Sequence, residues 1–143
     1  MLKSILLVLV GGAFGAVARE FMMLRVPNPA DQFPLDILVA NLIASLLLGL
    51  ITGLYQRKAV SEGVSLLIGT GLTGGLSTFS SFAYGTVVLM LASLRSAVVA
   101  SVYVISSLAL GYLAIVVGLK LAGARAAEPS QPSNALEARI NPP

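Results

Sequence analysis

The side chains that could bind a ligand in this chain are neutral hydrogen-bond donors. The 143 residues include no cysteine and no histidine, which excludes thiol and imidazole catalysis and nearly all zinc, copper and haem sites. The long apolar stretches carry Asn, Ser, Thr and Tyr, with no Asp, Glu or Lys at mid-depth. Such donors can replace the hydration shell of a small anion without holding it as tightly as Lys or Arg would. The candidate anion-binding residues are Asn41, Thr78, Ser81, Tyr103 and Ser107.

Two phenylalanines offer a second kind of anion contact. Phe79 and Phe82 are three residues apart and therefore share one face of a helix, next to the hydroxyls of Thr78 and Ser81. The edge of an aromatic ring is positive and a hydroxyl is a donor, so both can face an anion without carrying a full charge. The alternative is that the two rings only pack against lipid or a neighbouring helix.

These residues belong to an unusual apolar run. The stretch Gly69 to Gly85 reads GTGLTGGLSTFSSFAYG and lies in a segment, Gly63 to Leu94, that has no charged residue. The segment is long enough to cross a bilayer, but small and polar residues occupy its centre, where leucine is typical. Backbone that leaves the helical hydrogen-bond pattern at membrane depth needs partners in protein, ion or water. We therefore predict a transmembrane helix that is broken at its centre, with the break lining a site.

The composition predicts an all-α integral membrane protein. Hydrophobic residues make up 57% of the chain and charged residues only 10%. Apolar runs of bilayer length predict four transmembrane helices in one domain, residues 1–122, at about 4–24, 35–56, 63–92 and 96–119. Residues 123–143, rich in Ala, Pro, Ser and Asn, are predicted to be a disordered tail. The basic residues lie singly near segment ends, which gives no basis for nucleic-acid binding, and no catalytic residue is expected.

The first apolar segment admits two interpretations, and so does its arginine. Lys3, an apolar run and Ala16-Val17-Ala18 imitate a secretory signal, but the apolar pattern continues beyond them and favours a transmembrane helix. Arg19 falls on the same face as Gly12 and Gly15, which makes it a candidate for an anion vestibule. Snorkelling of its side chain at the end of the helix explains it equally well.

Three of the polar candidates also have a purely structural explanation. An intramembrane Asn such as Asn41 can join helices without touching a ligand. Tyr103 and Ser107 are one turn apart and Gly111 continues their face. Hydroxyls in membrane helices often bond the carbonyl of the preceding turn instead. The sequence leaves both explanations open for each residue.

Four helices leave little room for a transport pathway, so the chain is expected to self-associate. Small residues on the first and second helices, among them Gly11, Gly15 and Gly49, are the expected seam between subunits. Lys and Arg residues show only a weak excess on the side of the N-terminus, which is compatible with insertion in both orientations. That side carries Lys3, Arg57, Lys58, Lys120 and Arg125, against Arg19, Arg25 and Arg95 on the other.

Three segments together carry a family resemblance. They are GGAFGAVAR at 11–19, NLIASLLLG at 41–49 and GLTGGLSTFSSF at 71–82. The third is similar to the GxxGGxTTFSTF stretch of the Fluc fluoride channels, the CrcB family of small microbial membrane proteins. Over about residues 5–120 the chain resembles this family.

The resemblance implies a function and roles for particular residues. It implies an antiparallel homodimer with two pores that lets fluoride leave the cytoplasm passively, across the inner membrane of a bacterial cell. Asn41, Phe79 and Phe82 would contact fluoride, and a hydroxyl track would start at Tyr103 and Ser107.

The resemblance also implies a sodium ion, not transported, at the centre of the dimer. Backbone carbonyls in the break, at Gly74 and Ser77, would hold it. The residues fit this, because no carboxylate is near and a twofold axis through the break would double the carbonyl set into an oxygen cage. The alternative is that the glycines only permit a close helix crossing.

Two residues depart from the family pattern, and the sequence is also compared with the requirements of two other functions. Gly85 stands where many members carry Glu, and Gly111 occupies a track position where some carry Ser. The second function is a small four-helix multidrug or cation exporter of the dual-topology dimer type. It would require a membrane-embedded Glu in the first helix, and Glu20 lies too near the end of that helix. The third is a scaffold or assembly factor without transport.

Overall fold

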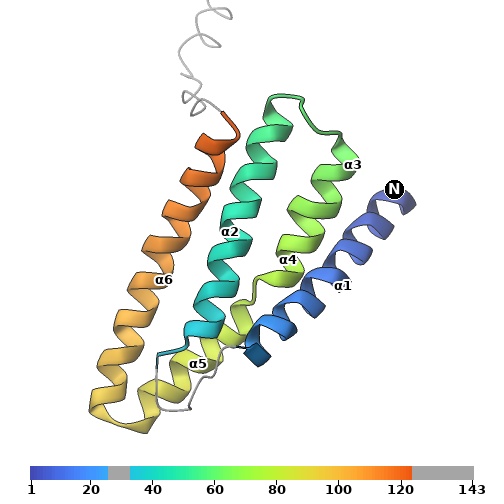
Figure 1. The fold of residues 1–143 in the computed structure, drawn as a ribbon. Helices are drawn as coiled ribbons and strands as arrows, with labels where there is room; N and C mark the ends of the chain where they lie inside the picture. The colour runs from blue at the N-terminus through green and yellow to red at the C-terminus, as the bar shows by residue number, and fades with distance from the viewer. Residues whose placement is uncertain (26–32, 124–143) are drawn as a thin grey trace, which may run out of the picture.

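A computed structural model describes residues 1–25 and 33–123, and these residues form helices that are long and apolar enough to cross a membrane four times. The four segments are Leu2–Arg25, Leu35–Gln56, Glu62–Ala92 and Leu94–Leu121 (Figure 1). The predicted helix boundaries therefore agree to within two residues, and the chain is a multi-pass membrane protein. The predicted disordered tail lies outside the described residues apart from residue 123, as does most of the predicted loop between the first two helices.

The first, second and fourth spans are single helices: α1 (Leu2–Arg25), α2 (Leu35–Gln56) and α6 (Leu94–Leu121). Proline and serine mark where two of them begin. Pro34 directly precedes α2, and the Ser93 hydroxyl oxygen accepts a hydrogen bond from the Ser96 N–H at 3.1 Å at the start of α6. An N-cap of this kind satisfies an N–H that the first turn of a helix leaves without an intrahelical partner.

The third span contains four helical pieces and one break. They are α3 (Glu62–Val64), the π-helix η1 (Ser65–Leu72), α4 (Thr73–Leu76) and α5 (Phe79–Ala92). Ser77 and Thr78 have extended backbone with ψ of 145° and 109°, so the helix stops at Leu76 and starts again at Phe79. The predicted break is confirmed, but it lies at Ser77 and Thr78, whereas the glycines from Gly69 to Gly75 are helical.

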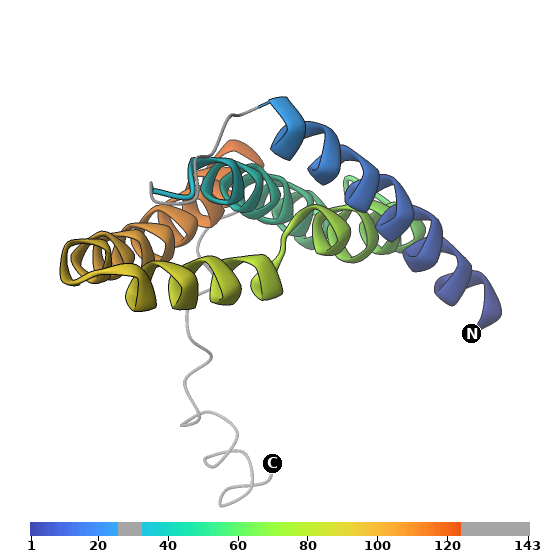
Figure 2. The same ribbon diagram turned by 90° about the horizontal axis from the view of Figure 1, so that it is seen from below.

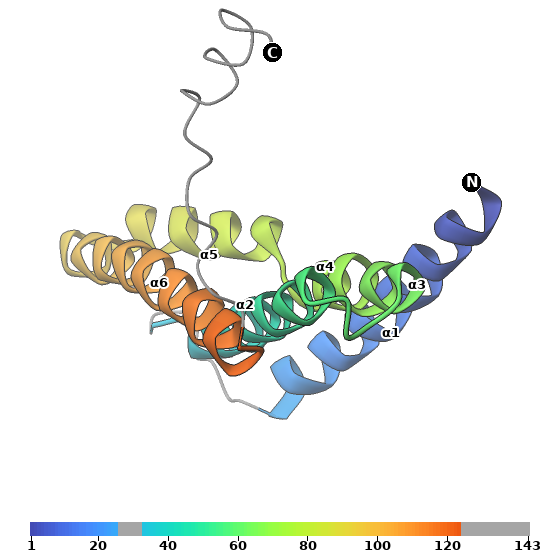
Figure 3. The ribbon, with the colours of Figure 1, turned by 90° about the horizontal axis from the view of Figure 1, so that it is seen from above.

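The spans form a bent layer rather than a closed bundle. Viewed along the helices, α6, α2, the η1–α4 part of the third span and α1 follow one another in that order (Figures 2 and 3). After the break, α5 leaves this layer and packs beside α6. A layer has two open faces, so large apolar side chains such as Phe14 and Leu108 remain exposed.

Glycines allow the neighbouring helices in this layer to touch backbone to backbone. A Cβ added at Gly11, Gly15 or Gly75 would overlap a carbonyl oxygen across the contact between α1 and the third span. Gly49 and Gly118 do the same between α2 and α6. The prediction that Gly11, Gly15 and Gly49 form a seam between subunits is therefore wrong, since all three are buried in contacts within one chain.

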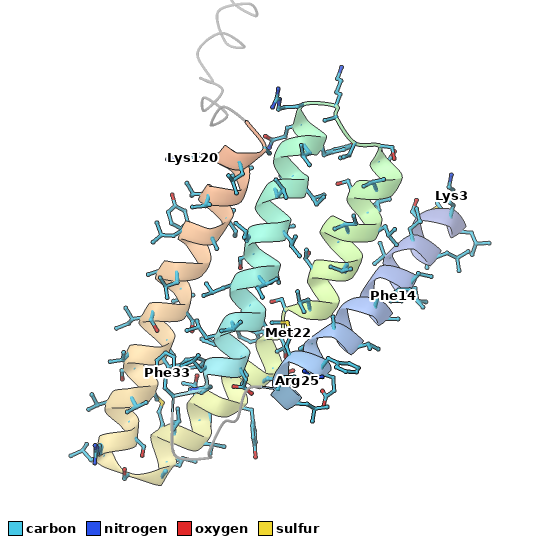
Figure 4. All side chains as sticks on the ribbon, viewed as in Figure 1. Lys3, Phe14, Met22, Arg25, Phe33 and Lys120 are labelled. Carbon is cyan, nitrogen blue, oxygen red and sulfur yellow. The ribbon has the colours of Figure 1, made fainter. Side chains whose placement is uncertain are left out.

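The charged residues collect at the two ends of the spans. Lys3 and Lys120 lie at one end and Arg25 lies at the other (Figure 4). At the first end, Arg57 Nη1 donates a hydrogen bond of 2.7 Å to the Ala122 carbonyl and so joins the last turn of α2 to the end of α6. This hydrogen bond thus holds α2 and α6 together at the end of the spans.

Candidate functional site

A cleft of about 290 Å³ opens where the break in the third span faces α2 and α6. It brings together five of the predicted anion-binding residues: Asn41, Thr78, Phe79, Phe82 and Ser107. The remaining residues that line it are Leu38, Leu42, Ser45, Ser77, Leu108, Gly111 and Tyr112. None of these twelve lining residues, all within the described ranges, carries a charge. The cleft is therefore a neutral surface of donors, rings and aliphatic groups.

Asn41 connects α2 to the break. Its Oδ1 atom accepts hydrogen bonds from the Thr78 N–H at 2.9 Å and from the Ser77 hydroxyl at 3.0 Å. A backbone N–H can only donate, so the oxygen of the amide must face the break and the NH₂ group must face away from it. Within the described part of the chain, that NH₂ group has no recorded hydrogen bond, which leaves two donors for a ligand.

Thr78 starts the helix that carries both phenylalanines. Its Oγ1 accepts a hydrogen bond from the Ser81 N–H at 3.2 Å, which caps the first turn of α5. The same hydroxyl donates to Ser81 Oγ at 3.0 Å. Ser81 does not line the cleft, so the structure brings this predicted residue next to Thr78 but not to the wall of the cleft.

Four aromatic rings form a row that begins at the cleft. Phe79 and Phe82 have centroids 6.1 Å apart, and Phe82 and Tyr103 have centroids 5.2 Å apart. Phe33 meets Tyr103 edge to face at 5.3 Å and ends the row. Phe82 is partly buried in this row, whereas Phe79 is 79% exposed in the single chain. Edge-to-face and tilted contacts of this kind are preferred by aromatic quadrupoles.

Tyr103 and Ser107 carry buried hydroxyls that have no hydrogen-bond partner among the described residues. Tyr103 is fully buried beneath Phe82 and does not itself line the cleft, while Ser107 does. Other hydroxyls on α6 donate to backbone carbonyls of the same helix. Ser106, for example, donates to the Tyr103 carbonyl at 3.1 Å. Unpaired buried hydroxyls are costly, and in native proteins they commonly indicate a ligand or water site.

Arg19 does not line the cleft but reaches the break from α1. Its Nη1 donates to the Gly75 carbonyl at 3.3 Å, one of the carbonyls at the end of α4 that the helical pattern leaves free. The Arg19 side chain therefore points toward the third span, as one of the two interpretations expects. A role in an anion vestibule stays a prediction.

The two residues predicted to hold a cation, Gly74 and Ser77, lie on the open side of the break. Both are exposed, and a Cβ added at Gly74 would meet nothing within 4 Å. In a continuous helix the Thr78 N–H would donate to the Gly74 carbonyl, but here it donates to Asn41. Likewise the Ser81 N–H donates to Thr78 Oγ1 rather than to the Ser77 carbonyl. Both carbonyls are thus free of the helical pattern.

Sequence reasoning missed three residues that the structure brings to this site. Phe33 lies between the first two predicted helices, Ser45 lies within the family-like segment at 41–49 without a role of its own, and Ser77 is predicted only to supply a carbonyl. The spacing of Asn41 and Ser45 was the available signal, since residues four apart share a helix face. Nothing in the sequence signals the Phe33 contact, because it joins segments 70 positions apart.

Comparison with known proteins places these features in a family. A sequence model described as CrcB-like protein, Camphor Resistance (CrcB), matches residues 6–119. A Brucella abortus protein named fluoride-specific ion channel FluC 1 is 57% identical over 120 residues, which are 84% of this chain and 44% of that protein. The chain thus spans less than half the length of this relative.

Two further relatives have lengths closer to that of this chain. The protein from Yersinia pseudotuberculosis named fluoride-specific ion channel FluC 3 is 49% identical over 85% of this chain and 90% of its own length. The Ignicoccus hospitalis protein named fluoride-specific ion channel FluC is 39% identical over 85% of this chain and 96% of its own length. All three names describe channels rather than enzymes. With the family match extending from the first span to the end of the fourth, the chain belongs to the CrcB-like protein family.

Proposed function

We propose that this chain forms a fluoride-selective channel that lets fluoride leave the cytoplasm passively through the inner (plasma) membrane of a bacterial cell. The relatives at 39% to 57% identity are named as fluoride-specific ion channels. The observation that carries the proposal is the neutral cleft at the break, which is lined by Asn41, Ser107, Phe79 and Phe82.

The chemistry of the cleft suits a small anion that must lose water. Fluoride is strongly hydrated, so a pathway has to offer donors in place of water and must still release the ion. Among the residues that line the cleft, the Asn41 NH₂ group can donate two hydrogen bonds and the Ser107 hydroxyl one, and the Tyr103 hydroxyl is a further single donor buried next to Phe82. The ring edges of Phe79 and Phe82 add weaker positive contacts. A Lys or Arg in the cleft would bind the anion too tightly for rapid release, and none lines it.

The working unit is proposed to be an antiparallel homodimer with two pores. The layered subunit leaves one side of the cleft open, and Phe79 remains 79% exposed there. A second copy across this face would cover the ring and enclose the cleft, in the way that twofold interfaces use the same surface on both subunits. The weak charge difference between the two ends of the spans is compatible with insertion in both orientations.

A structural sodium ion is proposed at the centre of this dimer. The Gly74 and Ser77 carbonyls of each subunit would hold it, because both are released from the helical pattern and lie on the open side of the break. A twofold axis between the breaks would supply four carbonyl oxygens, a set suited to a small monovalent cation. When bound, the ion would neutralise these dipoles and join the two subunits.

Fluoride efflux from liposomes tests the function. Purified protein is reconstituted into vesicles loaded with potassium fluoride, and fluoride release is followed with an electrode after valinomycin is added to balance charge. Passive release of fluoride without release of chloride from matched vesicles is expected. Proton-driven export of organic cations would identify a multidrug exporter instead, and the absence of any flux from folded dimers would support a scaffold.

A further inference from the structure

The hydroxyl row on α6 has a gap at Gly111. Tyr103, Ser107 and Gly111 succeed one another at intervals of one turn, and both Ser107 and Gly111 line the cleft. Glycine has no side chain, so the row itself has no donor at that level. An anion leaving Ser107 would need its next hydrogen bond from a residue outside this row.

Ser45 on α2 lies at this gap. A Cβ built at Gly111 would be 3.8 Å from Ser45 Oγ, with no other heavy atom recorded within 4 Å of it among the described residues. Ser45 also lines the cleft and is only partly buried. The side chain of a serine at position 111 would therefore lie next to the place where Ser45 already presents its hydroxyl.

The Ser45 hydroxyl is not bonded to its own helix. Hydroxyls in membrane helices usually donate to a carbonyl of the preceding turn. Thr86 does so to the Phe82 carbonyl at 2.8 Å, and Ser101 does so to the Ala97 carbonyl at 3.0 Å. For Ser45 no such bond is recorded in the described ranges, so its proton remains available to the cleft.

Tyr112 is the other hydroxyl-bearing residue near the gap, but it is less suitable. It lines the cleft next to Gly111, yet its side chain is 69% exposed in the single chain. Ser45, in contrast, follows Asn41 by one turn on the same face of α2. The free Asn41 amide and the Ser45 hydroxyl therefore form a continuous donor row along α2.

We propose that Ser45 is a pathway residue that supplies the donor missing at Gly111, so that the anion passes from Ser107 on α6 to Ser45 on α2. This inference rests on the proposed function, because it assigns a donor to the same fluoride pathway. It predicts that a hydroxyl is needed at this level of the cleft, and that either helix can carry it.

The test is a rescue experiment in fluoride-loaded liposomes. Ser45→Ala should lower fluoride flux about tenfold, which is ~1.4 kcal/mol in the barrier. Gly111→Ser alone should stay within about twofold of the parent, because it adds a hydroxyl next to an existing one. The double variant Ser45→Ala with Gly111→Ser should recover most of the lost flux. Ser45→Cys, which keeps the volume but has a weaker donor, should fall between the parent and Ser45→Ala.

Ser106→Ala is the matched control, since its hydroxyl already donates to the Tyr103 carbonyl and does not line the cleft. Its flux should equal that of the parent. Full flux in dimeric Ser45→Ala and Ser45→Cys would overturn the inference, and so would a double variant that is as slow as Ser45→Ala. If the parent conducts fluoride and only these variants behave unexpectedly, the Ser45 inference fails and the proposed channel function stands. If the parent itself shows no fluoride flux, both the channel function and the Ser45 inference are overturned.

Discussion

The Oδ1 atom of Asn41 on α2 accepts a 2.9 Å hydrogen bond from the backbone N–H of Thr78, the residue at which the third span turns back into a helix. One side chain thereby performs two tasks. It satisfies an N–H that the break would leave unpaired, and it fixes the amide so that its NH₂ group faces away from the break. The break and the donor are consequently coupled, and substitutions at Asn41 should affect stability and transport differently.

Asn41→Asp and Asn41→Ala should separate those two tasks. Aspartate keeps an acceptor for the Thr78 N–H but replaces two donors with a negative charge, so fluoride flux should be abolished. Alanine removes the acceptor and leaves the N–H unpaired, which should lower the free energy of unfolding by about 1–3 kcal/mol. Flux should fall less in Ala than in Asp. Thermal unfolding in detergent and liposome flux measure the two effects, and unchanged flux in Asn41→Asp would remove Asn41 from the pathway.

Both phenylalanines, Phe79 and Phe82, should be important for fluoride flux, whereas neither should be essential for folding. Phe79→Ile and Phe82→Ile keep apolar bulk and remove the ring edge, so each should lower fluoride flux at least about tenfold. Phe82 packs on Tyr103 in the aromatic row, so its replacement should also reduce thermal stability slightly. Phe79 is largely exposed in the single chain, so its replacement should not reduce thermal stability. Dimeric variants with full flux would show that the rings serve only packing.

Tyr103 should show a trade-off between stability and transport. Its hydroxyl is buried with no partner among the described residues, so Tyr103→Phe removes an unsatisfied group while the ring contacts with Phe33 and Phe82 remain. The variant should be as stable as the parent, or more stable by up to about 1 kcal/mol. Fluoride flux should nevertheless fall, and Ser107→Ala should behave similarly with a partial loss. A variant that is less stable but transports normally would contradict a pathway role and indicate a structural hydrogen bond.

The spans were predictable because charge, proline and bilayer length mark their ends. Arg25, Arg57 and Lys120 lie at or next to the ends of α1, α2 and α6, and Pro34 precedes α2. The site was predictable only as a set of residue types. Asn41 and Thr78 are 37 positions apart, and nothing local indicates that the amide oxygen of one would accept from the backbone of the other.

The exact residues of the break could not be predicted from the glycines, because glycine has two uses in membrane helices. It can leave the helical pattern, or it can stay helical and let another backbone approach. Gly75 does the latter, since a Cβ there would overlap the Gly12 carbonyl oxygen. The same ambiguity misplaced the seam between subunits, because a small-residue face shows that something packs closely but does not show which chain provides it.

The adjacent glycines Gly74 and Gly75 provide the last prediction, which concerns the proposed sodium ion. Gly75→Ala would force a methyl group onto the α1 backbone, so the subunit itself should lose stability by about 1–3 kcal/mol. A Cβ at position 74 would meet nothing within 4 Å in one chain, so Gly74→Leu should leave the subunit folded. Across a twofold axis, however, two such leucines would crowd the carbonyls, so dimers should dissociate.

Sodium dependence decides whether those carbonyls hold an ion. The parent dimer should be more stable in sodium than in a large organic cation, because a ligand that binds the dimer stabilises it. Ser77→Ala keeps the backbone carbonyl and should retain this dependence, whereas Gly74→Leu should lose it together with the dimer. The measurement is the dimer fraction by analytical ultracentrifugation in each salt. Equal stability of the parent in both salts, or a high-resolution map with only water between the two breaks, would remove the cation from the proposal and leave the fluoride pathway standing.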